Sequence, residues 1–170
     1  NSRTFVGSSI PDLQGGFGSN FRLYNFDLSL QFAYQLGGKF YDYQYAGLMH
    51  SGQLGKGWHT DMRARWSPEN PHTDVPRLEF ANQKLLSSSD RFLIDASYLS
   101  LRNISVGYSL PEEVCQKLHL NKLRYYITAE NVYLWSKRKG LDPRSSLSGV
   151  NSSAVYSPIR TVSMGLNLNF

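Results

Sequence analysis

The sequence predicts an all-β chain that contributes antiparallel strands to a large transmembrane β-barrel, with long extracellular loops and short periplasmic turns. Three observations carry this prediction. Several segments alternate apolar and polar residues, the polar rows consist of small side chains, and the connections are short and long in turn.

Apolar residues recur at alternate positions in each predicted strand, most weakly in residues 16–24, because side chains alternate between the two faces of a strand. The predicted strands cover residues 16–24, 26–36, 98–110, 122–135 and 160–170. In the third strand Leu101 and Ile104 both belong to the apolar row although their spacing is odd, which predicts a β-bulge near Arg102.

The residues between the apolar ones are mostly Gly, Ser, Asn and Thr, with few long charged side chains. This composition suits the wet interior of a large barrel whose outer face contacts lipid. A soluble β-sandwich would bury the same apolar rows and would expose residues such as Lys, Glu and Thr. The alternation alone leaves both folds open.

The connections favour the membrane barrel. Asn25 alone links the first two strands, and residues 111–121 link the third to the fourth. The other connections, residues 37–97 and 136–157, are long. Tight turns at one end and extended loops at the other are typical of outer-membrane barrels, whereas a compact soluble domain rarely contains a long insertion without structure of its own.

Aromatic residues of the apolar rows gather near the two predicted membrane surfaces, with aliphatic residues between them. With the C-terminus placed in the periplasm, the predicted girdles are Tyr108 and Tyr125 at the inner surface and Tyr34, Tyr133 and Trp135 at the outer surface. Two aromatic girdles around an aliphatic band are what a bilayer selects.

Five strands cannot close a barrel, since the smallest membrane barrels need about eight. An open edge in lipid would leave unpaired backbone groups that cost several kcal/mol each. We therefore expect residues 1–170 to be the C-terminal part of a longer barrel, or to pair with further chains.

Five segments, in this order and spacing, resemble the C-terminal region of the SusC/RagA family of TonB-dependent outer-membrane transporters of Bacteroidetes. They are YNFDLSLQFAYQLGGKFYD (24–42), RWSPENPHTDVPR (65–77), SDRFLIDASYLSLRNISVGYSLP (89–111), LRYYITAENVYLWSKRKGLDP (123–143) and IRTVSMGLNLNF (159–170). The resemblance implies a plugged barrel of about twenty-two strands, of which residues 1–170 lack the plug domain and the earlier strands. It also implies a SusD-like surface lipoprotein as a lid, energy from the TonB complex through the plug, and import of oligosaccharides or peptides.

The apolar row of the last strand resembles the assembly signal that the outer-membrane insertion machinery recognises. This row consists of Met164, Leu166, Leu168 and Phe170. An ordinary lipid-facing strand would carry the same row, and the two interpretations are compatible.

The first long connection carries aromatic residues that could contact a substrate or the lid, namely Tyr41, Tyr43, Trp58 and Trp66. Packing of the loop on itself is the favoured interpretation of these residues. His59 and Asp61 do not extend to a set of metal ligands at familiar spacing, so neither a metal nor a cofactor is expected.

The sequence gives no indication of catalysis or of nucleic-acid binding. The sequence has no nucleophile elbow, no Walker loop and no dinucleotide motif, so we expect no enzyme and no catalytic residue. The net charge is +5, and the one basic run, residues 137–139, could contact lipopolysaccharide phosphates or be a solvated loop; no nucleic-acid partner is expected. Residues 111–120 predict a short periplasmic helix with Pro111 at its first position and Cys115 as an inert, half-buried thiol.

The expected location is therefore the outer membrane of a Gram-negative bacterium. Two alternatives stay open from the sequence. One is a soluble β-sandwich module that binds carbohydrate through its Trp and Tyr residues, and the other is a porin-like pore assembled from several chains.

Overall fold

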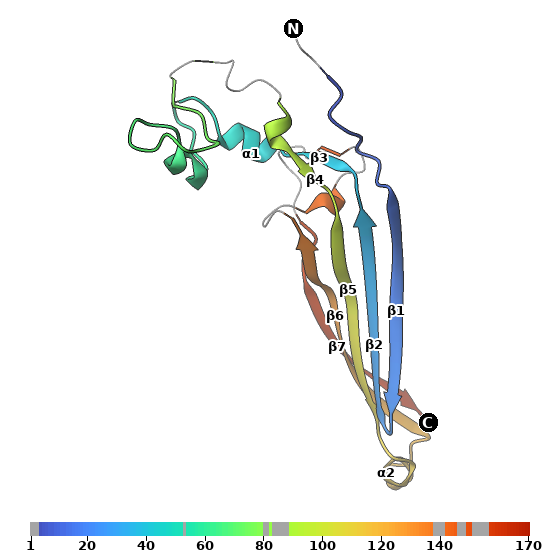
Figure 1. The fold of residues 1–170 in the computed structure, drawn as a ribbon. Coiled ribbons are helices and arrows are strands. Elements are labelled where there is room, and N and C mark those ends of the chain that lie inside the picture. Colours follow the sequence, from blue (N-terminus) through green and yellow to red (C-terminus); the bar gives the residue numbers. More distant parts are fainter. Residues whose placement is uncertain are drawn as a thin grey trace.

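The computed structural model describes residues 4–52, 54–79, 82, 89–137, 142–145, 149–150 and 157–170. Its main feature is a five-stranded antiparallel sheet with the strand order β1-β2-β5-β6-β7 (Figure 1). The strands are β1 (Leu13–Leu23), β2 (Phe26–Leu36), β5 (Tyr98–Ser109), β6 (Lys122–Ser136) and β7 (Thr161–Asn169). All five predicted strands are present, and the described sheet stays open at β1 and β7.

Shorter elements lie beyond the two ends of the sheet. They are β3 (Lys39–Tyr41), α1 (Tyr43–Leu48), η1 (Thr60–Ala64), η3 (Asp90–Phe92), β4 (Leu93–Asp95), α2 (Glu112–Lys117) and η4 (Pro143–Ser145). Figure 1 shows α2 and the C-terminus at one end of the sheet, while α1, β3 and β4 lie at the other. In the described part of the chain, no helix has the length and apolar character needed to cross a membrane.

The cross-strand register keeps apolar and polar residues on separate faces of the sheet. One apolar row runs through Leu28, Val106, Ile127 and Met164. The adjacent polar row runs through Ser29, Ser105, Thr128 and Ser163. A shift of one residue between any two strands would mix these rows, so the alternation within each strand and the pairing between strands agree.

The bulge predicted near Arg102 is confirmed. Leu101 and Asn103 pair with consecutive residues of β2, which leaves Arg102 as an extra residue in β5. On the other side, Asn131 and Val132 of β6 lie opposite Arg102. Asn131 has a φ of 51°, a left-handed conformation that asparagine adopts more readily than most residues.

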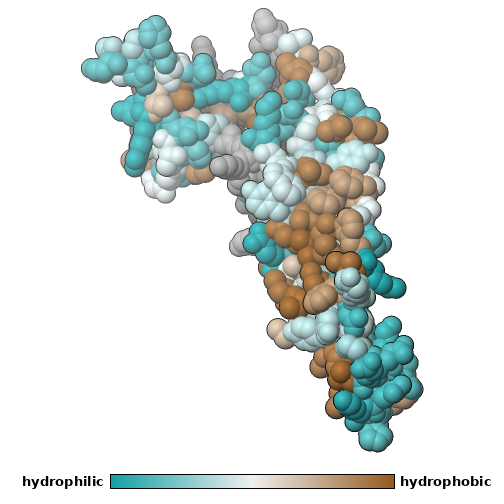
Figure 2. All heavy atoms as spheres, turned by 60° about the horizontal axis from the view of Figure 1, so that its bottom comes forward, coloured by the Kyte–Doolittle hydropathy of each residue, from teal (hydrophilic) through white to brown (hydrophobic). Residues whose placement is uncertain are grey.

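The apolar face of the sheet is not covered by another described element. The buried apolar residues of the described chain are Phe40, Met49, Met62, Phe92, Ala96 and Cys115, and all lie outside the five main strands. Met164 in β7, by contrast, is 73% exposed. Figure 2 shows a hydrophobic band over the middle of the molecule, with hydrophilic residues gathered toward its ends. A sandwich would require a second sheet against this face, and the other described sheet consists only of β3 and β4.

The connection between β2 and β5 has a small core of its own, which differs from the expectation of a long segment without clear structure. Phe92 packs with Met49 and Met62, and the rings of Tyr41 and Tyr45 lie 6.2 and 5.9 Å from that of Phe92. The helices and strands that carry these residues are only three to six residues long. Hydrophobic periodicity can be recognised only in longer segments, so the sequence did not predict these short helices and strands.

The proline-containing part of this connection is held by its own hydrogen bonds, as a rigid loop requires. The Trp66 amide donates to the Val75 carbonyl oxygen at 2.8 Å, and the Thr73 hydroxyl donates to the Ala64 carbonyl oxygen at 2.6 Å. These bonds close residues 64–75 into one compact turn.

At the opposite end of the sheet, α2 differs in detail from the predicted helix. Pro111 is the residue before the helix, and the helix ends at Lys117 because His119 has a φ of 57°. The amides of His119 and Leu120 then bond to the carbonyl oxygens of Gln116 and Cys115, which is a Schellman motif. The Cys115 side chain is fully buried rather than half-buried, because it lies under this turn with Sγ 3.7 Å from the Leu110 carbonyl oxygen.

Candidate functional site

The polar face of the sheet is the surface that would line a lumen, and its residues are small for a geometric reason. Tyr126 of β6 lies across from Gly165 of β7, and a Cβ at Gly165 would come within 2.5 Å of the Tyr126 ring. Gly107 of β5 is similarly covered by side chains from both neighbouring strands. The glycines therefore give room to the few large polar side chains of this face.

The largest polar contact on this face is an ion pair across three strands. Arg124 of β6 reaches over Gly107 to Asp27 of β2, with Nε 2.9 Å from Oδ1 and Nη2 2.5 Å from Oδ2. The Arg124 guanidinium also lies over the Tyr126 ring, 5.1 Å from its centroid. The two bonds are bidentate and charge-assisted, which fixes the orientation of both side chains.

A cavity of about 560 Å³ surrounds this ion pair at the turn end of the sheet. Its lining includes the basic residues Arg22, Lys122 and Arg124 and the acidic residues Asp27 and Glu112. The cavity is therefore polar and carries a small excess of positive charge, which agrees with a surface that contacts water or another polar segment.

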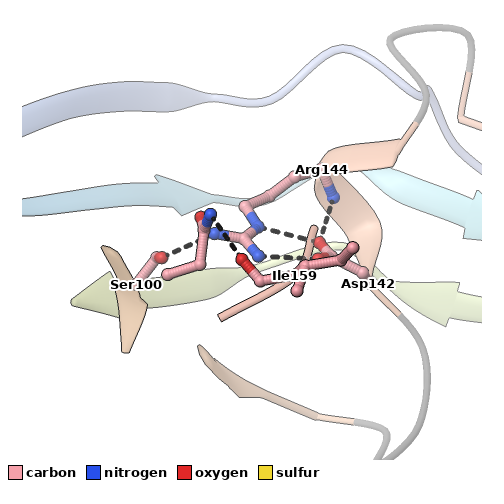
Figure 3. A network of polar contacts seen from close by, with 5 residues as sticks. Ser100, Asp142, Arg144 and Ile159 are labelled. Carbon is pink, nitrogen blue, oxygen red and sulfur yellow. Dashed lines mark hydrogen bonds and ion pairs between the residues drawn. The ribbon is translucent and has the colours of Figure 1, made fainter. Parts of the chain in front are cut away.

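At the loop end, a second polar network ties the connection between β6 and β7 to the polar face (Figure 3). Arg144 makes a bidentate pair with Asp142 at 2.7 and 2.8 Å and donates to the Ser100 hydroxyl at 2.8 Å. The Arg144 and Asp142 side chains are only 10% and 5% exposed, and the hydrogen bond to Asp142 raises the pKa of Arg144. Nearby, the Asn131 amide donates to the Ile159 carbonyl oxygen at 3.1 Å.

Neither network was predicted from the sequence. Asp27 and Arg124 are charged residues on the polar face, but the register aligns Asp27 with Gly107 and Tyr126 and aligns Arg124 with Ser109. Their pairing is therefore diagonal and depends on the reach of the Arg124 side chain over Gly107. The contact between Ser100 and Arg144 joins residues 44 positions apart through an irregular loop, and no spacing in the sequence signals it.

The aromatic loop residues proposed for substrate or lid contact do not form one cluster. The rings of Tyr41 and Tyr43 are 4.5 Å apart, and Tyr41 also packs against the loop core, whereas Tyr43 is half-exposed. Trp58 is 51% exposed and donates from Nε1 to the carbonyl oxygen of His50 at 3.0 Å. Trp66 is partly exposed on the proline-containing turn. A role of these residues in contacting a substrate or a lid stays a prediction.

His59 and Asp61 serve the local fold. The Asp61 amide donates to His59 Nδ1 at 3.2 Å, and the Asp61 carboxylate accepts a bond from the Tyr45 hydroxyl at 2.7 Å. Within the described ranges, no three His, Cys, Asp or Glu side chains come together as a metal site would require.

The predicted girdle residues lie near the ends of the apolar face. At the turn end, Tyr108 pairs with Tyr125 across the strands, and its ring lies 4.7 Å from that of Phe26. At the loop end, the rings of Tyr133 and Trp135 are 4.7 Å apart, and Tyr34 lies two strands away from Trp135. Their contact with membrane surfaces stays a prediction.

The final strand presents its apolar row at an open edge. The residues of this row, Met164, Leu166, Leu168 and Phe170, are between 51% and 82% exposed. Such an edge can pair with a further strand. Recognition of this row as an assembly signal stays a prediction.

Comparison with known proteins identifies this type of sheet. No model of a protein family matches the chain. Among solved structures, the RagAB peptide importer in its open-open state aligns with 98% of this chain at a TM-score of 0.81 and 26% identity, and in its closed-closed state at a TM-score of 0.82. The described sheet is thus of the class found in the wall of a TonB-dependent receptor barrel.

Curated sequences agree with the structural match. TonB-dependent receptor P3 of Formosa agariphila is 33% identical over 99% of this chain, and TonB-dependent receptor SusC of Bacteroides thetaiotaomicron is 36% identical over 48% of it. The chain is homologous to part of the SusC/RagA-type TonB-dependent receptors. It spans 17% of the length of receptor P3 and 18% of the aligned RagAB chain. This receptor family is not enzymatic, in agreement with the expectation from the sequence.

Proposed function

We propose that this chain forms part of the wall of an outer-membrane importer that is energised by the TonB complex and covered by a SusD-like lipoprotein. The observation that carries the proposal is the contrast between the two faces of the five-stranded sheet. One face is apolar and uncovered, and the other is built of small polar residues. Homology to SusC/RagA-type receptors supports the TonB-dependent mechanism.

In this proposal residues 1–170 are the C-terminal part of the barrel, and the plug and the earlier strands belong to other parts of the protein. The apolar face contacts lipid, with the aromatic girdles at the two membrane surfaces. The polar face lines the lumen, and the long connections shape the outer mouth. The free edge of β7 pairs with a further strand of the barrel, and its apolar row serves as the assembly signal.

The imported substrate is an oligosaccharide or a peptide. The aligned RagAB complex is a peptide importer, which supports peptides. Among the loop aromatics named above, Tyr43, Trp58 and Trp66 are exposed enough for contact with the lid or the substrate, whereas Tyr41 is engaged in the loop core. Aromatic side chains with a polar atom are suited to such contacts because they combine apolar area with a hydrogen bond.

The test begins with the intact protein purified from its native cells. We expect it in the detergent-extracted outer-membrane fraction, at a mass several times the 19.3 kDa of this chain, together with a lipoprotein. Uptake of labelled peptides or oligosaccharides by these cells should depend both on this protein and on TonB.

Other outcomes would contradict the proposal. A protein of about 19.3 kDa in the aqueous fraction would favour the carbohydrate-binding sandwich. Ion conductance by several copies of the chain, without dependence on TonB, would favour the porin-like pore.

The lid contact is tested separately by substituting loop aromatics. Tyr43→Ala and Trp66→Ala should reduce the amount of lipoprotein that co-purifies with the intact protein. Tyr133→Ala is the matched control, because Tyr133 is an exposed aromatic residue on the sheet rather than on the loops. An equal reduction in all three variants would exclude a specific role of the loop aromatics.

A further inference from the structure

A groove on the apolar face, at the loop end of the sheet, is suited to a lipid. Its floor is Leu99 of β5, and its walls are Tyr34 of β2 and Trp135 of β6, which are the direct cross-strand neighbours of Leu99. Strands are spaced by about 4.8 Å, so the two aromatic walls stand roughly 10 Å apart. The smaller Leu99 between them leaves a channel that runs along the strands.

The size and the lining of the groove fit a hydrocarbon chain. Its volume is about 540 Å³, and Phe17 and Leu36 extend the apolar lining. This volume lies within the range of about 300–1,000 Å³ that small-ligand sites occupy. The groove is open along one side, as a site for part of a lipid within a bilayer would be.

The rim of the groove carries charge at the end nearest the loops. Lys137 lies 3.9 Å from Asp95, and its side chain is 75% exposed, so its ammonium group is held only loosely. Asp95 is paired across strands with Lys39, and its carboxylate also accepts two hydrogen bonds from Ser97. Lys137 and Lys39 both act electrostatically on the Asp95 carboxylate, so the two lysines exceed this carboxylate by one positive charge.

We propose that this groove binds an acyl chain of a phosphorylated glycolipid of the lipid A type, with a phosphate of its headgroup on Lys137. The apolar channel accounts for the acyl chain, and the cation at its rim accounts for the phosphate. Lysine near a membrane surface extends its ammonium group toward headgroups in this way. Lipid A is the occupant chosen here because the groove lies at the loop end, which is the outer leaflet in the proposed orientation.

The inference rests on the proposed outer-membrane location, and the experiment separates the two. The intact protein is purified from the outer membrane in mild detergent, and bound lipid A is measured by native mass spectrometry. Absence of the protein from that membrane would refute the location, whereas presence without bound lipid A would refute only the groove.

Leu99→Trp should fill the floor of the groove and remove the bound lipid. Val106→Trp is the matched control, since Val106 lies on the same strand and the same apolar face but outside the groove. Equal loss or equal retention of lipid in both variants would mean that only unspecific boundary lipid is present.

The rim is tested by substituting the exposed lysine of the groove. Lys137→Glu should weaken binding of added diphosphoryl lipid A to the delipidated protein by about tenfold, and should not affect dephosphorylated lipid A. Lys117→Glu, an exposed lysine in α2 at the opposite end, is the charge-matched control. Equal affinity of the two variants for diphosphoryl lipid A, or preferential retention of a phospholipid instead of lipid A, would overturn the proposal.

Discussion

Arg124 and Asp27 form a bidentate ion pair although the whole width of strand β5 lies between the strands that carry them. The pair is possible because Gly107 occupies the intervening position, where a Cβ would lie within 2.5 Å of Asp27 Oδ1. Both side chains are about one-quarter exposed. The pair therefore links three strands on the polar face through side chains as well as through the backbone.

We expect Asp27 and Arg124 to be energetically coupled. In a double-mutant cycle of Asp27→Asn and Arg124→Gln, the coupling energy should be about 1 kcal/mol, at the upper end of values for partly exposed pairs. Urea unfolding of the intact protein in lipid vesicles measures this quantity. The exposed pair Arg77 and Glu79 serves as the control and should show weaker coupling. Additive effects of the two substitutions on the sheet would show that the ion pair contributes nothing to stability.

The two faces of β7 should respond differently to the same charge. Met164→Lys places a charge on the apolar face opposite Ile127, near the middle of the band, and should cost about 2–4 kcal/mol in the folded barrel. Ser163→Lys adds the same charge on the polar face, opposite Thr128, and should cost much less. The yield of heat-resistant barrel on gels measures the difference. Equal yields would contradict the assignment of the faces.

Gly165 should tolerate a larger side chain poorly for a different reason. Gly165→Leu should displace the Tyr126 ring, which lies where the new Cβ would be. We expect restored yield in the double variant Gly165→Leu with Tyr126→Ala, because the smaller residue leaves room for leucine. A yield of folded barrel that stays low in the double variant would show that Gly165→Leu clashes with a residue other than Tyr126.

Arg144 should hold the connection between β6 and β7 against the sheet. Arg144→Gln leaves the buried Asp142 without its guanidinium, and breaking a buried pair in this way costs about 3–5 kcal/mol. Hydrogen exchange of peptides covering residues 142–145 and 157–160 should become faster in this variant. The exposed substitution Arg77→Gln should leave the same peptides unchanged. Unchanged exchange in Arg144→Gln would show that the loop is held by other contacts.

Acid should loosen the junction between β2 and β4. Hydrogen bonds from Ser97 lower the pKa of Asp95, and the Ser97 hydroxyl in turn accepts a bond from the Gly37 amide. A carboxylate with a lowered pKa stabilises the fold above its unfolded-state pKa of about 3.9, and this contribution disappears as the pH falls through the folded-state value.

Hydrogen exchange tests this expectation. After correction for intrinsic rates, protection of residues 37–41 and 93–97 should fall below about pH 4 in the unaltered protein. Asp95→Asn should remove this pH dependence, whereas Asp90→Asn should retain it. Identical pH profiles for Asp95→Asn and the unaltered protein would exclude Asp95 as the responsible group.

The five strands of the sheet could be predicted from the sequence because each of them repeats the same alternation of apolar and polar residues over many positions. The bulge at Arg102 could also be predicted, because Leu101 and Ile104 are three positions apart and can share the apolar face only if the strand contains an extra residue between them. The core around Phe92 was not predicted because its helices and strands are too short to show a hydrophobic periodicity. The contact between Arg144 and Ser100 was missed because it depends on the path of an irregular loop.

The extra residue in β5, Arg102, shifts the alternation of side chains between the two faces by one position. Between Asn103 and Ser109 the strand follows one alternation, and between Tyr98 and Leu101 it follows the other. Removal of Arg102 would join Leu101 directly to Asn103 and give β5 one unbroken alternation against β2, but it would leave Asn131 and Val132 of β6 with no residue opposite them. The bulge at Arg102 is therefore matched to β6 rather than to β2, because only β6 has two extra residues at this position.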